Sequence, residues 1–204
     1  KGKTSSDLAT SYMSPETLTA MKHNMFTPGN YFYNGIGHVT VDYGKVITYG
    51  YSEYIKEIEE ELAGMRVSDA NYCKKHALLE AMLISLRAVI RYAKRYSRLA
   101  KEMAEKEQNG TRKAELLKIS ENCDRVPESG ARNFYEACQS FWFIQMLIQV
   151  ESSGHSISPG RFDQYMYPFY KKSLDAGMTR EQAQEYIDCI WVKLNDLNKC
   201  RDAV

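Results

Sequence analysis

The stretch FWFIQMLIQVESSGHSISPGRFDQYMYPFY, residues 141–170, decides the fold. Residues 141–150 are apolar apart from Gln145 and Gln149, and a helix with such a sequence has no solvent-facing stripe. We therefore predict a helix that is buried on most sides. Residues 151–158 are polar or glycine apart from Ile157, with one histidine and four serines, and a Pro-Gly turn follows. This pattern fits either an active-site wall at the end of a buried helix or an ordinary surface loop.

The chain on both sides of this stretch is also helical in pattern. Apolar residues recur at three- and four-residue steps, which predicts a mainly α fold without βαβ alternation or internal repeats. Besides the buried helix, we expect helices at about residues 15–25, 42–63, 69–108, 111–123 and 180–194. Thr179 and Gln182 match a capping box at the start of the last one. The segment 38–41 (HVTV) alternates like a short strand, but Thr40 and Asp42 also suit a helix start.

Composition excludes several classes of function. The chain has 204 residues, with 27 Lys and Arg against 26 Asp and Glu, which argues against nucleic acid or an anionic membrane as a partner. No apolar run reaches the length of about 18 residues that a membrane helix needs, and the N-terminus is no signal peptide. We predict a soluble, cytoplasmic protein and, over residues 1–204, no internal domain boundary.

The cysteines and histidines point to no metal centre. The five cysteines are scattered and form no CxxC pair, which fits a reducing compartment rather than disulfides or zinc. We expect Cys138 and Cys189 to lie in the core. His23 and His76 sit on helical stretches with charged neighbours and are expected at the surface. We predict no metal site.

Two histidines follow a glycine directly and are the candidates for chemistry: Gly37-His38 in the first histidine loop and Gly154-His155-Ser156 in the second. The glycine permits a tight turn that presents the imidazole, and an imidazole can transfer a proton near neutral pH or hold a hydroxyl group. Both could equally be structural.

Arg161 and Asp163 follow the second histidine loop. They could form an ion pair that fixes the turn, or they could bind a substrate carboxylate. Their spacing of two residues in a loop favours the structural pair, so we predict a structural brace.

Two long stretches resemble the glycyl radical enzymes, the superfamily similar to pyruvate formate-lyase. They are MFTPGNYFYNGIGHVTVDY, residues 25–43, and ESSGHSISPGRFDQYMYP, residues 151–168. Within the superfamily they are most similar to the B12-independent glycerol and propane-1,2-diol dehydratases. The resemblance extends over essentially the whole chain.

The resemblance implies a protein several times longer, with a ten-stranded α/β barrel wrapped in helices. This chain would be part of the N-terminal helical region. Such enzymes keep a radical on a glycine in a C-terminal Arg-Val-x-Gly-Tyr loop, where a radical S-adenosylmethionine activating enzyme installs it, and relay it to a Cys-x-Glu cysteine. Neither motif occurs here. The resemblance therefore implies that this chain alone binds no cofactor and is inactive.

The resemblance also assigns roles. His38 and His155 match catalytic residues that bind the substrate together with Ser156, and the substrate would be glycerol or propane-1,2-diol. An imidazole assists the loss of a hydroxyl group, which is a poor leaving group, and a serine orients a hydroxyl. The full-length protein would be an anaerobic, homodimeric lyase in the cytoplasm, or in a bacterial microcompartment there.

Three alternatives stay open. The first is another branch of the superfamily, such as an isethionate, choline or hydroxyproline lyase. The second is a formate acetyltransferase, although such enzymes hold a carboxylate with arginines, which the two histidine loops lack. The third is a helical module without catalytic activity.

Overall fold

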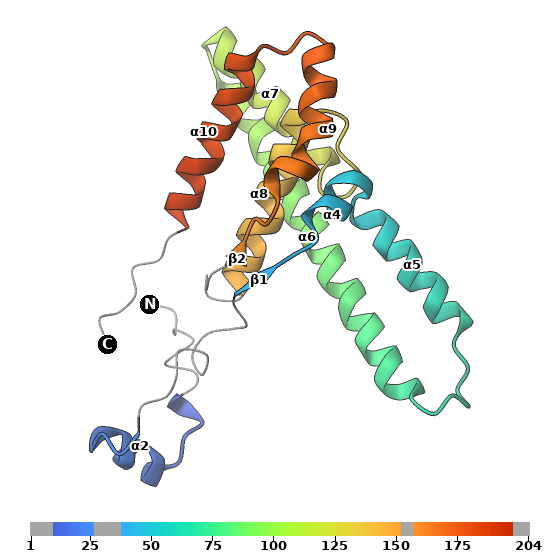
Figure 1. The fold of residues 1–204 in the computed structure, drawn as a ribbon, viewed down its shortest axis with the longest axis vertical. Coiled ribbons are helices and arrows are strands. Elements are labelled where there is room, and N and C mark those ends of the chain that lie inside the picture. The colour runs from blue at the N-terminus through green and yellow to red at the C-terminus, as the bar shows by residue number, and fades with distance from the viewer. Residues whose placement is uncertain (1–9, 27–37, 152–156, 198–204) are drawn as a thin grey trace. The chain divides into compact units, whose positions relative to one another are not determined.

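A computed structural model describes residues 10–26, 38–151 and 157–197. In this part the chain is mainly α, as predicted (Figure 1). The helices are α2 (Pro15–Lys22), α4 (Tyr43–Tyr49), α5 (Tyr51–Gly64), α6 (Tyr72–Lys106), α7 (Gly110–Arg125), α8 (Phe134–Glu151), α9 (Phe162–Asp175) and α10 (Arg180–Asp196). The strands are β1 (Val39–Thr40) and β2 (Ile157–Ser158).

The contacts of the chain cluster in two units. One unit contains residues 1–41, 145–160 and 192–204, and the other contains residues 42–144 and 161–191. β1 and β2 belong to the first unit, whereas most of the helical core belongs to the second. The absence of an internal domain boundary stays a prediction.

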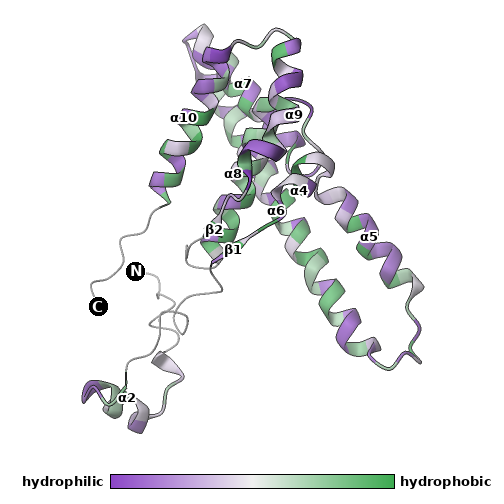
Figure 2. Ribbon diagram, viewed as in Figure 1, coloured by the Kyte–Doolittle hydropathy of each residue, from purple (hydrophilic) through white to green (hydrophobic). Residues whose placement is uncertain are grey.

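The aromatic core of the second unit surrounds the middle of α8. The ring of Phe141 lies 5.0 Å from that of Tyr43 and 5.1 Å from that of Phe162, and Tyr43 stacks on Tyr165 at 5.8 Å. Figure 2 shows hydrophobic colour along much of α8. The predicted burial is confirmed for the first half of the 141–150 stretch but is wrong at its end, where Val150 is exposed.

Helices α5, α6 and α7 confirm the periodic pattern between residues 51 and 125. α5 and α6 run side by side in opposite directions (Figure 1), and Arg87 of α6 donates to Glu59 of α5 at 2.6 Å. α6 packs against α7, where the hydroxyl of Ser120 donates to the carbonyl of Ser97 at 2.9 Å. None of the described helices has the length and hydropathy of a membrane-spanning segment.

The helix expected at 42–63 is broken at Gly50, which corrects the sequence prediction. Gly50 has a φ of +81°, and a Cβ built on it would lie 2.4 Å from the carbonyl oxygen of Glu128. The first N–H groups of α5 donate to the carbonyls of Pro127 and Glu128, each at 2.9 Å. The break therefore comes from a contact with a segment far along the chain, and a periodic pattern carries no sign of it.

Gly130 lies in the segment that contacts the end of α4, and it also approaches the α4 backbone closely. A Cβ built on it would lie 2.1 Å from the carbonyl oxygen of Thr48, and the next residue, Ala131, donates its N–H to the carbonyl of Ile47 at 2.8 Å. The end of α4 and residues 127–131 thus approach each other backbone to backbone. Only glycine fits at such a distance.

The last helix confirms one prediction and corrects another. The N–H of Thr179 donates to Oε1 of Gln182 at 2.9 Å, and the N–H of Gln182 donates to Oγ1 of Thr179 at 3.1 Å, so the capping box forms. Cys189, expected in the core, is exposed. The buried face of α10 is marked by Ala183 and Ile190, and Cys189 lies about 100° around the helix from Ile190. Cys138 is buried, as predicted.

A buried carboxylate fixes the start of α8. Glu136 is fully buried and accepts hydrogen bonds from Nη2 and from the backbone N–H of Arg132 at 2.5 and 2.7 Å. Nε of Arg125 lies 3.5 Å from Oε2 of Glu136. A buried charge is tolerated only when it is paired and hydrogen-bonded. The first turn of α8 therefore depends on these two arginines.

We expect Glu136→Gln to loosen the start of α8 by roughly 2 kcal/mol, because charge-assisted hydrogen bonds are lost from a buried site. Amide exchange in the first turns of α8 should then become about 30-fold faster. Glu121→Gln is the matched control, because Glu121 also binds Arg132 but is half exposed. Equal exchange in the two variants would contradict this account of Glu136.

Candidate functional site

A two-stranded parallel sheet joins the segments that follow the two histidine loops. Val39 pairs with Ile157, and Thr40 pairs with Ser158. In the sequence, His38 directly precedes the first pair on one strand, and Ser156 directly precedes it on the other. Two segments that lie far apart in the sequence therefore share one sheet within one unit.

His38 has a backbone conformation that is rare outside glycine. It is exposed and forms the bend before β1, with a φ of +55°. This left-handed conformation is sterically unfavourable for side chains with a Cβ, although histidine adopts it more often than most residues. Such conformations cluster at functional sites, where the surrounding structure maintains them. The catalytic and substrate-binding role of His38 stays a prediction.

His155 and Ser156 lie outside the described residues, so their predicted place beside His38 stays a prediction. The next residue along the chain is described. Ile157 is buried, and its carbonyl accepts a hydrogen bond from Nε2 of Gln145 at 3.1 Å. Gln145 lies on α8 and is only 1% exposed. The downstream end of the second histidine loop is therefore held by β1 and by α8.

The turn after β2 packs against β1. Gly160 has a φ of +66°, and a Cβ on it would come within 2.6 Å of Cγ2 of Thr40. Its N–H donates to Oγ of Ser158 at 3.2 Å. The positive φ therefore favours glycine here, and a larger residue would also require the Thr40 side chain to shift. The predicted Pro-Gly turn is thus part of the contact between the two strands.

Arg161 and Asp163 form the ion pair that their spacing predicts. Nε and Nη2 of Arg161 donate to the two carboxylate oxygens of Asp163 at 3.2 and 3.1 Å, and these hydrogen bonds hold the pKa of the Asp163 carboxyl below its usual value. Both side chains are about 70% exposed, and exposed ion pairs contribute little to stability. The role of the pair as a structural brace stays a prediction.

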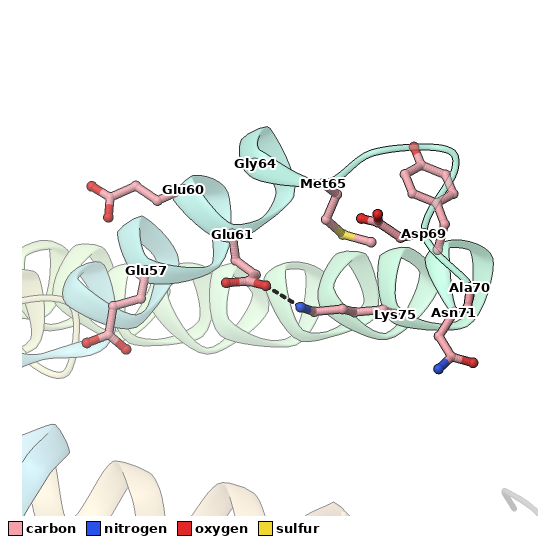
Figure 3. Close-up of a pocket in the computed structure, with 10 residues that line it drawn as sticks. Glu57, Glu60, Glu61, Gly64, Met65, Asp69, Ala70, Asn71 and Lys75 are labelled. Carbon is pink, nitrogen blue, oxygen red and sulfur yellow. Dashed lines mark hydrogen bonds and ion pairs between the residues drawn. The ribbon is translucent and has the colours of Figure 1, made fainter.

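A surface pocket of about 640 Å³ lies where α5 ends and α6 begins, and Figure 3 shows its lining. It is lined by Glu57, Glu60, Glu61, Gly64, Met65, Asp69, Ala70, Asn71, Tyr72 and Lys75. Glu61 and Lys75 form an ion pair across it. The pocket contains none of the predicted site residues and no histidine.

Two further histidines, His23 and His76, lie in the part of the chain that the structure describes. His23 is exposed, as predicted, and His76 is half-buried against the ring of Tyr72 at 5.4 Å. Among residues 10–26, 38–151 and 157–197, no three His, Cys, Asp or Glu side chains gather as metal ligands.

Sequence reasoning noted Gln145 only as a polar exception in an apolar run. A signal was nevertheless present, because an amide buried in such a helix must find hydrogen-bond partners. The partner itself, the carbonyl of Ile157, could not be identified without the tertiary structure.

Comparison with known proteins matches the whole chain to one family. The sequence pattern of the pyruvate formate lyase-like family covers residues 1–204. A solved structure that concerns 1,2-propanediol dehydration in Roseburia inulinivorans is 63% identical, with a TM-score of 0.85 over 99% of this chain and 24% of that one. The glycerol-bound form of the B12-independent glycerol dehydratase from Clostridium butyricum is 53% identical, with a TM-score of 0.83 over 99% of this chain and 25% of that one.

A third relative has another activity in its name. The isethionate sulfite-lyase of Desulfovibrio desulfuricans is 46% identical over 154 residues, which are 74% of this chain and 18% of that protein. The chain thus spans about a quarter or less of the length of the relatives that it matches.

Proposed function

Because the chain belongs to the pyruvate formate lyase-like family, we propose that it is the N-terminal helical region of a longer glycyl radical dehydratase. The proposed substrate is propane-1,2-diol or glycerol. The observation that carries this proposal is the pairing of β1 with β2, because it ties together the segments that follow the two histidine loops. The high identity to the two diol-dehydrating relatives supports the choice of substrate.

The proposed site binds a neutral polyol through His38, His155 and Ser156. Loss of water from a 1,2-diol yields an aldehyde without net oxidation or reduction, so one hydroxyl group must leave as water. One imidazole protonates or hydrogen-bonds this hydroxyl, and the serine hydroxyl orients its neighbour. The two histidine loops contain no arginine, which suits an uncharged substrate better than a carboxylate.

The remaining chemistry belongs to parts of the protein outside this chain. A protein radical there, installed by a radical S-adenosylmethionine activating enzyme, would abstract hydrogen from the substrate. The histidines and the serine of this chain would hold the substrate and transfer the proton. We further propose a cytoplasmic homodimer, in or outside a bacterial microcompartment, working without oxygen. The chain alone should be inactive.

The proposed function is tested with the activated full-length protein and a panel of substrates. We expect conversion of propane-1,2-diol or glycerol to the corresponding aldehyde. The panel should include isethionate, choline and trans-4-hydroxyproline, each assayed at equal radical content. Turnover of one of these compounds, with no aldehyde from either diol, would overturn the substrate assignment.

A second candidate is an isethionate lyase, which is favoured by the 46% identity to the Desulfovibrio desulfuricans protein. It breaks a carbon–sulfur bond and releases sulfite instead of water. Its substrate carries a permanent negative charge, and a sulfonate is usually held by cationic groups. Sulfite release in the panel would decide for this candidate.

A further inference from the structure

Gln145 is a buried polar side chain that connects α8 to β2. Its Nε2 donates to the carbonyl of Ile157 at 3.1 Å, and both residues are buried. Within the described residues, β2 has a neighbouring strand, β1, on one side only. The hydrogen bond from Gln145 thus adds a fixed point on β2 that the sheet does not supply.

The carbonyl that accepts this hydrogen bond belongs to the residue directly after the second histidine loop. Ile157 carries the accepting carbonyl, is paired with Val39, and follows Ser156 directly in the sequence. A backbone held at Ile157 restricts the loop that ends there, because successive Cα atoms are only 3.8 Å apart. The same pairing holds Val39, the residue after His38. The hydrogen bond from Gln145 therefore restrains the residue pair Val39–Ile157, whose members follow the two histidine loops in the sequence.

We infer that Gln145 is a positioning residue for the proposed reaction, because it holds Ile157, the residue that follows the second histidine loop in the sequence and pairs with Val39, the residue after His38. The inference rests on the proposed function for the chemistry, and on the hydrogen bond for the geometry. Gln145 does not need to touch the substrate. Its effect is exerted through the backbone of β2, and catalysis is sensitive to such effects because misplacement of a reacting group by about 1 Å can lower a rate about 100-fold.

The turn after β2 limits how this strand can adjust. Gly160 packs closely against Thr40 of β1, and a Cβ on Gly160 would lie 2.6 Å from Cγ2 of Thr40. Ile157 is thus held by α8, while the segment three residues later is held against β1. A strand fixed at both points cannot slide along β1 without breaking one of these contacts. Removal of the Gln145 amide releases the first contact and leaves the second intact.

The test uses Gln145→Met and Gln149→Met in the full-length enzyme. Methionine has nearly the length of glutamine but lacks an N–H donor. Gln149 lies one helical turn further along α8, is half-buried, and makes no hydrogen bond with its side chain among the described residues. We expect kcat, normalised to radical content, to fall about 100-fold in Gln145→Met with little change in KM. Gln149→Met should keep its rate.

A double-mutant cycle separates positioning from a general loss of structure. If Gln145 acts through the second histidine loop, then Gln145→Met should cost much less in a His155→Ala background than in the wild type. A purely structural role would give the same fold-loss in both backgrounds. Equal losses, or a Gln145→Met enzyme with the rate of Gln149→Met, would overturn the inference.

Failure of the proposed function would be recognised separately. The comparison is made with whichever panel substrate the wild type converts, so a wrong substrate leaves the test of Gln145 intact. Independently of any turnover, the amide of Ser158 should exchange faster in Gln145→Met than in Gln149→Met. An unchanged exchange rate there would overturn the claim that Gln145 holds β2.

Discussion

In the activated full-length enzyme, His155→Ala should lower kcat for propane-1,2-diol about 1,000-fold. General acid catalysis by a positioned side chain contributes roughly 10²- to 10⁴-fold, and a hydroxyl group leaves slowly without it. The radical content, measured by electron paramagnetic resonance, should stay near that of the wild type, because the radical would lie elsewhere in the protein. The assay compares kcat per radical for the two proteins.

A substitution at His38 can remove proton transfer while it keeps the backbone conformation. Because asparagine also tolerates the left-handed conformation, His38→Asn should preserve the bend before β1 and keep a hydrogen-bonding group, but it cannot transfer a proton. We expect a loss of at least 100-fold in kcat and an unchanged melting temperature. His76→Ala, on α6, is the control and should retain activity. Full activity in both His38→Asn and His155→Ala would refute the proposed site.

The largest effect on stability is expected for Gly130→Ala. Its new Cβ would lie 2.1 Å from the carbonyl oxygen of Thr48, and a backbone atom cannot move aside as the end of a flexible side chain can. We expect a local destabilisation of roughly 4 kcal/mol, at the upper end for single substitutions. Amide exchange at the end of α4 and in residues 127–131 should report it as a rise of about 10³-fold.

Gly64→Ala is the matched control, because a Cβ on Gly64 meets nothing within 4 Å. Gly64 is the last residue of α5, so the substitution should be neutral or stabilising by up to about 1 kcal/mol. If Gly130→Ala fails to accumulate as folded protein while Gly64→Ala does, the steric account is supported. Similar exchange rates in both variants would show that the backbones of α4 and residues 127–131 can move apart at little cost, and would contradict the steric account.

The sequence predicts those features that depend on neighbours a few residues apart. The helical pattern of residues 72–125, the cap at Thr179 and the ion pair of Arg161 with Asp163 all follow from local spacing, and the structure contains each of them. The family resemblance, which rests on residues 25–43 and 151–168, is confirmed by the match over the whole chain.

The features that the sequence did not predict depend on contacts between distant segments. The alternation of residues 38–41 allowed a strand at β1, but β2 has only two residues, and no local pattern indicated β2 or its pairing with β1. The break at Gly50 comes from the carbonyls of Pro127 and Glu128. The start of α4 is capped by Asp42, whose Oδ1 accepts from the N–H of Lys45 at 3.2 Å, so the strand and the helix start, seen as alternatives for this segment, both occur.

The pairing of Val39 with Ile157 also has a consequence for the order of events during synthesis. The two residues are 118 positions apart, from 39 to 157, and a ribosome adds roughly 5 to 20 residues per second. β1 is therefore synthesised about 6 to 24 seconds before β2, the strand with which it pairs. Helices α4 to α7, and residues 127–131 that contact the junction of α4 with α5, are all synthesised before β2 and can fold in that interval. The two strands can pair only after residue 158 has been made, so a nascent chain that stalls before residue 154 would contain β1 and helices α4 to α7 but neither the second histidine loop nor β2.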